Sequence, residues 1–147
     1  MDDQNWLKYG AIGLVAIGFF AILWFALNRV DGLEGTSWSV ETLALDGVSV
    51  TPIDGTELTA IFDDAAVAGT AGCNGFNASY ETDGDLLSVG PAASTLKFCD
   101  QPAGIMDQEV AYLTLLQSAD RFDIDGGVLT MYAEDSQVLS FVGPNTD

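Results

Sequence analysis

The chain has 147 residues, of which 22 are Asp or Glu and four are Lys or Arg, so its net charge is −18 at pH 7. A chain this acidic is repelled by polyanionic nucleic acid, which excludes nucleic-acid binding. Histidine is absent, and this excludes Ser-His and Cys-His nucleophiles and removes the commonest ligand of zinc and haem.

An apolar run near the N-terminus is the first recognisable element. Residues 10–27 read GAIGLVAIGFFAILWFAL, without a charged or strongly polar residue. As a helix this run is about 27 Å long, close to the hydrocarbon core of a bilayer. A cleaved signal peptide is the alternative, but its apolar region is shorter and ends in a small-x-small site, which is missing here. The run predicts a transmembrane helix over residues 10–27, between an N-terminal segment (1–9) and a polar linker (28–35).

The charge distribution predicts which side of the membrane the domain occupies. Residues 1–29 carry two acids and two bases, whereas residues 30–147 carry the whole net charge of −18. Anionic lipids of the cytoplasmic leaflet would repel so acidic a domain. We therefore expect a cytoplasmic N-terminus and a periplasmic, or otherwise extracytoplasmic, C-terminal domain.

Beyond the linker the sequence reads as short β-strands separated by turn signals. β-Branched and aromatic residues alternate with polar ones, and Asp-Gly pairs mark several of the turns. The predicted strands cover residues 36–45, 48–53, 57–62, 66–71, 76–80, 86–89, 94–98, 122–124, 128–132 and 138–142.

One segment between these strands has helical spacing instead. Pro102 suits the first position of a helix, after Asp100 or Gln101 as its cap. Apolar residues then recur at spacings of three and four: Met106, Val110, Leu113 and Leu116. The prediction is an α+β fold over residues 36–143: an antiparallel β-rich domain, either a curled sheet or a partly open barrel of about 7–8 strands, with one amphipathic helix.

Calcium is the one metal that the residues suggest. Asp123 to Gly126 resemble part of an EF-hand loop, but this alignment puts Arg121 and Tyr132 where carboxylate oxygens are required. Asp83-Gly84-Asp85 is first a turn signal. We therefore predict no metal site, no cofactor and no catalytic residue, and so a protein that is not an enzyme, with Ca²⁺ binding as the alternative.

Four segments of the domain together resemble the META domain family, which includes the HslJ-like heat-shock proteins. They are Gly-Thr-Ser-Trp at 35–38, Ala-Gly-Cys-Asn-Gly-Phe at 71–76, Ser-Thr-Leu-Lys-Phe-Cys at 94–99, and the helix. The resemblance covers about residues 33–142, and the matching residues are Trp38, Gly72, Cys73, Asn74, Phe76, Tyr80, Ser94, Thr95, Cys99 and Glu109. Gly75, Phe76 and Lys97 depart from the usual Arg, Tyr and Met. The resemblance implies an envelope location and a link to heat-shock or stress responses, without a defined activity.

The state of Cys73 and Cys99 depends on the compartment. A disulfide between them would close a loop of about 27 residues and stabilise the fold by about 3 kcal/mol in the chain-entropy model. Two buried free thiols in a reducing compartment are the alternative. The predicted anchor and the family resemblance both favour the disulfide.

These observations predict a membrane-anchored, non-catalytic META-like module of the cell envelope. Its expected role is stress tolerance or envelope maintenance, through binding an unidentified partner. The alternative is an accessory single-helix subunit of a larger membrane protein complex, in which Gly10, Gly13 and Ala16 would line a helix–helix contact.

Overall fold

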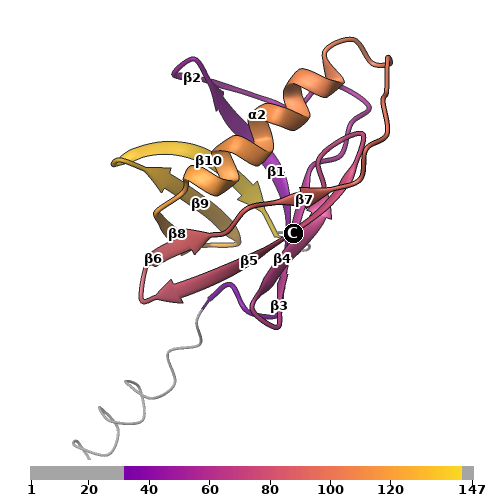
Figure 1. The fold of residues 1–147 in the computed structure, drawn as a ribbon. Helices are drawn as coiled ribbons and strands as arrows, with labels where there is room; N and C mark the ends of the chain where they lie inside the picture. Colours follow the sequence, from indigo (N-terminus) through magenta and orange to yellow (C-terminus); the bar gives the residue numbers. More distant parts are fainter. Residues whose placement is uncertain (1–31, 144–147) are drawn as a thin grey trace, which may run out of the picture. The chain divides into compact units, whose positions relative to one another are not determined.

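The computed structural model describes residues 32–143 (Figure 1). The predicted N-terminal segment (1–9), the predicted transmembrane helix (10–27) and linker residues 28–31 lie outside the described range. Within residues 32–143, no helix combines the length and the hydropathy needed to cross a bilayer.

The described part of the chain contains ten β-strands and one α-helix (Figure 1). The strands are β1 (Thr36–Leu45), β2 (Val48–Val50), β3 (Thr59–Asp63), β4 (Ala66–Thr70), β5 (Gly75–Asp83), β6 (Leu86–Val89), β7 (Ala93–Ser94), β8 (Arg121–Asp125), β9 (Val128–Ala133) and β10 (Ser136–Val142). The helix, α2, spans Ile105–Ser118 and follows β7.

The strands form one antiparallel sheet that closes on itself. Its order is β10-β9-β8-β6-β5-β4-β3-β1-β2, and β1 also pairs with β10. Of the ten strands, β2 and β7 lie outside this ring, so eight strands make a barrel. The predicted antiparallel fold with one helix is confirmed.

Alternation along the strands places the core inside the barrel. In β5, Phe76, Ala78 and Tyr80 are buried while the residues between them are exposed, because successive side chains point to opposite faces. The helix α2 packs against β1, β6, β9 and β10 (Figure 1). Its Tyr112 is completely buried and meets the Phe76 ring edge-on, with 5.8 Å between the ring centroids.

The helix begins later than predicted. It starts at Ile105 after Gly104, which has a φ of 85° and is the N-cap, whereas Pro102 follows a cis peptide bond and lies outside the helix. The predicted strand over residues 94–98 was also too long, because strand pairing ends at Ser94.

The predicted apolar face of the helix was wrong at its centre. Val110 is 65% exposed, whereas the polar residues Gln108 and Glu109 are buried. The apolar spacing misled because this helix turns two polar side chains inward, where backbone and side-chain groups of the segments that connect the strands provide their partners.

The chain enters the barrel at the end that carries the β3–β4 turn. Leu33, which the sequence analysis placed in the linker, is completely buried. The Glu34 carboxylate accepts hydrogen bonds from the backbone N–H of Asp64, at 2.7 Å, and from the Tyr80 hydroxyl. Residues 32–35 are therefore part of the folded domain. We call this the entry end, and the opposite end, which carries the β4–β5 turn (residues 71–74), the distal end.

Candidate functional site

Asn74, in the β4–β5 turn, is the centre of a polar junction at the distal end. Its amide nitrogen donates to Glu109 Oε1 at 2.7 Å and to the carbonyl of Lys97 at 3.0 Å. Its amide oxygen accepts from Thr95 Oγ1 and from the backbone N–H of Lys97, both at 2.8 Å. The amide thus uses both donors and both acceptor positions. One 2% exposed side chain fastens the segment after β7 to the helix.

Glu109 completes the junction from the helix side. Its second carboxylate oxygen accepts the backbone N–H of Asn74 at 2.8 Å. The carboxylate is 5% exposed, and two hydrogen bonds to a negatively charged acceptor offset its desolvation.

A covalent bond lies beside these hydrogen bonds. Cys73 and Cys99 form a disulfide with an S–S distance of 2.02 Å, which confirms the predicted pairing. It joins the β4–β5 turn to the end of the segment that Asn74 binds. Residues 95–99 are therefore held at three points, namely Thr95, Lys97 and Cys99.

Gly72 allows the turn to pack under the start of the helix. Its φ is 106°, and a Cβ there would lie 3.4 Å from Ile105 and 3.6 Å from Gln108. A side chain at this position would make ordinary contacts with the helix but would require an unfavourable backbone conformation.

The other residues of the family pattern lie elsewhere. Trp38, Phe76 and Tyr80 are buried members of the barrel core. Ser94 is exposed, and its backbone pairs with β5. The structure therefore brings together Gly72, Cys73, Asn74, Thr95, Cys99 and Glu109, and separates the remaining four.

Two further helix side chains bind the segment from Ile53 to Thr59, and the sequence analysis missed both. Gln108 accepts from the backbone N–H of Ile53 at 2.7 Å and donates to Thr56 Oγ1 at 3.0 Å. The Tyr112 hydroxyl donates to the carbonyl of Thr59 at 2.9 Å, and burial raises the pKa of this tyrosine. The signal was available, because residues 105, 108, 109, 112 and 116 form a stripe at helical spacing.

A groove of about 490 Å³ lies at the distal end between the β1–β2 hairpin and one face of α2. Its wall is mostly apolar, and the exposed carboxylates of Asp46 and Asp107 belong to it. The lining residues are Leu43, Ala44, Leu45, Asp46, Val50, Thr51, Ile53, Gly104, Asp107, Gln108, Ala111, Thr114 and Leu115.

An exposed apolar projection also lies at the distal end. Leu96 is 96% exposed and Phe98 is 82% exposed, although both are large apolar residues. They flank the exposed Lys97, whose backbone is bound to Asn74. We call residues 96–98 the finger.

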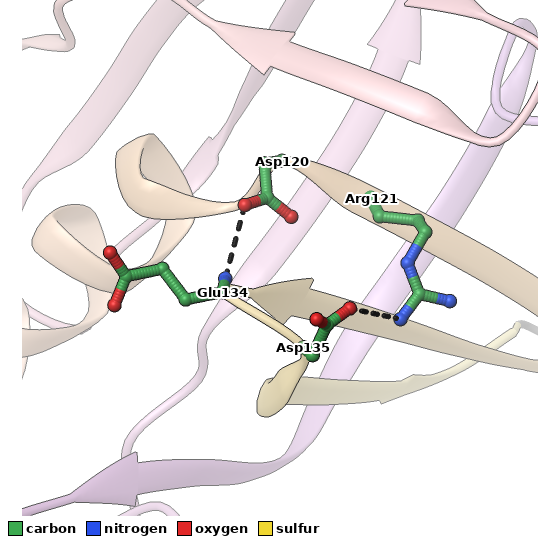
Figure 2. Close-up of polar contacts among 4 residues, drawn as sticks. All are labelled: Asp120, Arg121, Glu134 and Asp135. Carbon is green, nitrogen blue, oxygen red and sulfur yellow. Dashed lines mark hydrogen bonds and ion pairs between the residues drawn. The ribbon is translucent and has the colours of Figure 1, made fainter.

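Lys97 and Arg121 are the two basic residues of the described range, and their surroundings differ. Figure 2 shows Arg121 on β8, where its guanidinium lies 3.6 Å from Asp135 in the β9–β10 turn. The guanidinium also lies over the Tyr132 ring, 4.5 Å from its centroid. Lys97 forms no ion pair within residues 32–143.

The META domain family model matches residues 31–146. The chain belongs to the META domain family. A solved structure, the NMR structure of a protein from Burkholderia xenovorans, is 27% identical over 77% of this chain and 84% of that one, with a TM-score of 0.63. A second NMR structure, whose title names no organism, is 19% identical over 76% of this chain and 92% of that one, with a TM-score of 0.56, and shows the shared fold alone. No curated protein matches.

The buried polar side chains of this META domain are hydrogen-bonded within the described residues. In the described range, every buried side-chain nitrogen and oxygen has a hydrogen-bond partner. No three His, Cys, Asp or Glu side chains within residues 32–143 gather where they could hold a metal ion, and this includes Asp83, Asp85, Asp123 and Asp125. The family pattern at 71–76 and 94–99 builds a rigid distal end, and the groove and the finger are its accessible features.

Proposed function

We propose that this META domain is a membrane-tethered, non-catalytic interaction module of the cell envelope, and that its distal end is the interaction surface. One observation carries the proposal: the groove and the finger lie at the end of the barrel opposite the chain entry. β1 runs from Thr36, which pairs with Phe62 at the entry end, to Leu45 in the wall of the groove. A domain attached to a membrane through its entry end keeps its distal end free for a partner.

The tether comes from the apolar run at residues 10–27, which is long enough for one transmembrane helix. Because Leu33 and Glu34 belong to the folded domain, a short stretch of sequence separates it from the apolar run. An extended chain from residue 27 to residue 32 spans at most about 17 Å.

The location outside the cytoplasm is supported by the disulfide and by the charge. A disulfide between Cys73 and Cys99 persists in oxidising compartments such as the periplasm. The roles in stress tolerance and envelope maintenance rest on the resemblance to HslJ-like proteins.

A non-catalytic role is supported by the use of the polar groups. Asn74 and Glu109 are the most buried polar pair of the junction, and their hydrogen bonds are directed at each other and at the segment after β7. The groove wall carries two carboxylates and hydroxyl and amide groups, but neither a histidine nor a cysteine nor a lysine. Such a wall binds apolar groups and has no nucleophile with an adjacent base.

The test is purification of the full-length chain from native membranes in mild detergent, followed by mass spectrometry of co-purifying proteins. We expect the chain to resist alkaline extraction from membranes and to retain a stoichiometric partner, either another protein or a second copy of the chain, which the mass of the intact complex reveals. Ala111→Arg in the groove wall should release that partner, while Val110→Arg on the exposed face of the same helix should keep it. A partner lost equally from both variants would contradict the assignment of the groove.

The nature of the partner separates the two functional hypotheses. A partner retained through the groove supports the interaction module. A partner retained by a chain with the Ala111→Arg change, but lost when residues 10–27 are replaced by an unrelated transmembrane helix, would instead support an accessory subunit of a membrane complex.

A further inference from the structure

We propose that the distal end binds a second copy of this chain, with the finger of each copy in the groove of the other. The inference rests on the proposed function, because it names the partner of the same surface. It follows from the apolar character and the opposite charges of two features that one molecule carries at one end.

The finger has the form of a pre-ordered ligand. Thr95 and Lys97 are bound to Asn74 on either side of Leu96, and the disulfide at Cys99 fixes the residue after Phe98. The intervening side chains are thereby turned outward, and the backbone that carries them is already ordered. Binding of such a segment loses little conformational entropy, so the apolar contact contributes more to affinity.

The groove has the form of a receptor for this ligand. Its volume of about 490 Å³ falls within the range of binding pockets, and its apolar wall suits a leucine or phenylalanine side chain. Asp46 and Asp107 offer carboxylates to a cation that arrives between two apolar groups. The finger has this arrangement, with Lys97 between Leu96 and Phe98.

The charges of the domain make a second copy a more specific partner for the finger than other acidic surfaces. Residues 30–147 carry a net charge of −18, so two copies repel each other unless a basic group meets an acidic one at the contact. Arg121, on β8, forms an ion pair with Asp135 (Figure 2) and lies over the Tyr132 ring. Lys97 is the described basic residue without an ion pair, and it lies on the apolar projection.

A lipid surface fits the finger less well. The finger is bound to the β4–β5 turn, at the opposite end of the barrel from Leu33 and Glu34, where the chain enters. An anionic bilayer would also repel the acidic domain around the finger. If both fingers enter both grooves, the contact is isologous and closes as a two-fold dimer.

The experiment measures dimerisation of the full-length chain in lipid nanodiscs and mild detergent by mass photometry and by energy transfer between labelled copies. Phe98→Ser should weaken the dimer roughly 30-fold, as expected for loss of a central aromatic contact. The matched control is Leu86→Ser, which removes an exposed apolar residue of β6, and should leave the dimer unchanged. Unchanged melting temperatures show that both variants fold.

Charge reversal makes the test specific for the finger and groove. Lys97→Glu alone, and Asp46→Lys with Asp107→Lys, should each weaken the dimer roughly tenfold or more because like charges then meet. All three substitutions together should restore it. A chain that stays monomeric, or a dimer that Phe98→Ser leaves intact or that the combined reversal does not restore, overturns the inference.

The outcomes also separate this inference from the proposed function. A photoreactive residue at position 98 in native membranes should cross-link to a second copy of the chain. Cross-linking to a different protein would overturn the dimer and leave the interaction module standing, whereas cross-linking to lipid would overturn the dimer and assign the finger to the bilayer. Loss of the chain from the membrane fraction would contradict the tether alone.

Discussion

Replacing Asn74 with alanine tests the view that the family pattern builds a structural junction. The substitution removes four side-chain hydrogen bonds: those to Glu109, to the Lys97 carbonyl, from Thr95 and from the Lys97 N–H. It also leaves the Glu109 carboxylate, 5% exposed, with the backbone N–H of residue 74 as its remaining partner at the junction.

The expected cost follows from the kind of each bond. A hydrogen bond to a charged group contributes about 1.5–3 kcal/mol and a neutral one about 0.5–1.5 kcal/mol, and the contributions are not additive. A buried charge that loses a partner adds to the cost. We expect the unfolding free energy to fall by about 3–5 kcal/mol, a large part of the 5–15 kcal/mol that is usual for a domain.

The assay is urea denaturation of the full-length chain in mild detergent, followed by near-ultraviolet circular dichroism. Asn77→Ala is the matched control, because Asn77 is exposed on the adjacent strand β5. Asn74→Asp provides a second test, since it places a carboxylate against Glu109. The free energy of unfolding should fall at least as far as for Asn74→Ala, because a second acidic side chain then faces Glu109 at a buried position. A cost for Asn74→Ala within about 1 kcal/mol of the control would refute the reasoning.

Three other predictions concern the entry end, the helix and the disulfide. The hydrogen bond from the Tyr80 hydroxyl is the main cause that lowers the pKa of Glu34 from 4.5, and the backbone N–H of residue 64 adds to it. The ionised carboxylate therefore stabilises the fold above pH 4.5, and this contribution is lost as the pH falls through the pKa of Glu34 in the folded state. Glu34→Gln should therefore lower the melting temperature at pH 7 and have less effect at pH 3, and an equal effect at both would contradict the assignment. Tyr112→Phe leaves a buried carbonyl without its donor, and should cost about 1–2 kcal/mol in urea unfolding. Reduction of the disulfide should cost about 3 kcal/mol, and the Cys73→Ser, Cys99→Ser double variant should match the reduced protein and show no further change with reductant.

The strands were predictable because apolar and polar residues alternate along them, and this alternation follows directly from a barrel wall with one buried and one exposed face. β5 alternates buried and exposed residues along most of its length, and turn residues such as Gly84 mark where strands end. Closure of the ring was not predictable in this way, since the pairing of β1 with β10 joins segments from opposite ends of the domain. Local periodicity contains no information about which distant edge a strand meets.

The candidate site was predictable in its residues and not in its geometry. The family pattern contained Asn74, Thr95 and Glu109. Hydropathy favours an apolar helix face and so passed over Gln108, whose burial depends on a backbone and a side-chain partner elsewhere in the chain. The finger was missed for a related reason. The alternation of residues 94–98 resembles a strand, whereas side-chain hydrogen bonds to Asn74 replace strand pairing there and expose both apolar residues.

The closed ring has a consequence for how this domain can be recognised and how it avoids aggregation. The strands outside the ring in the described range, β2 and β7, have three and two residues, which is too short to template pairing with another chain. Partners cannot readily join this domain by adding a strand, so recognition depends on side chains. The same lack of a backbone template limits edge-to-edge association between copies of the domain, so contacts between copies also depend on side chains.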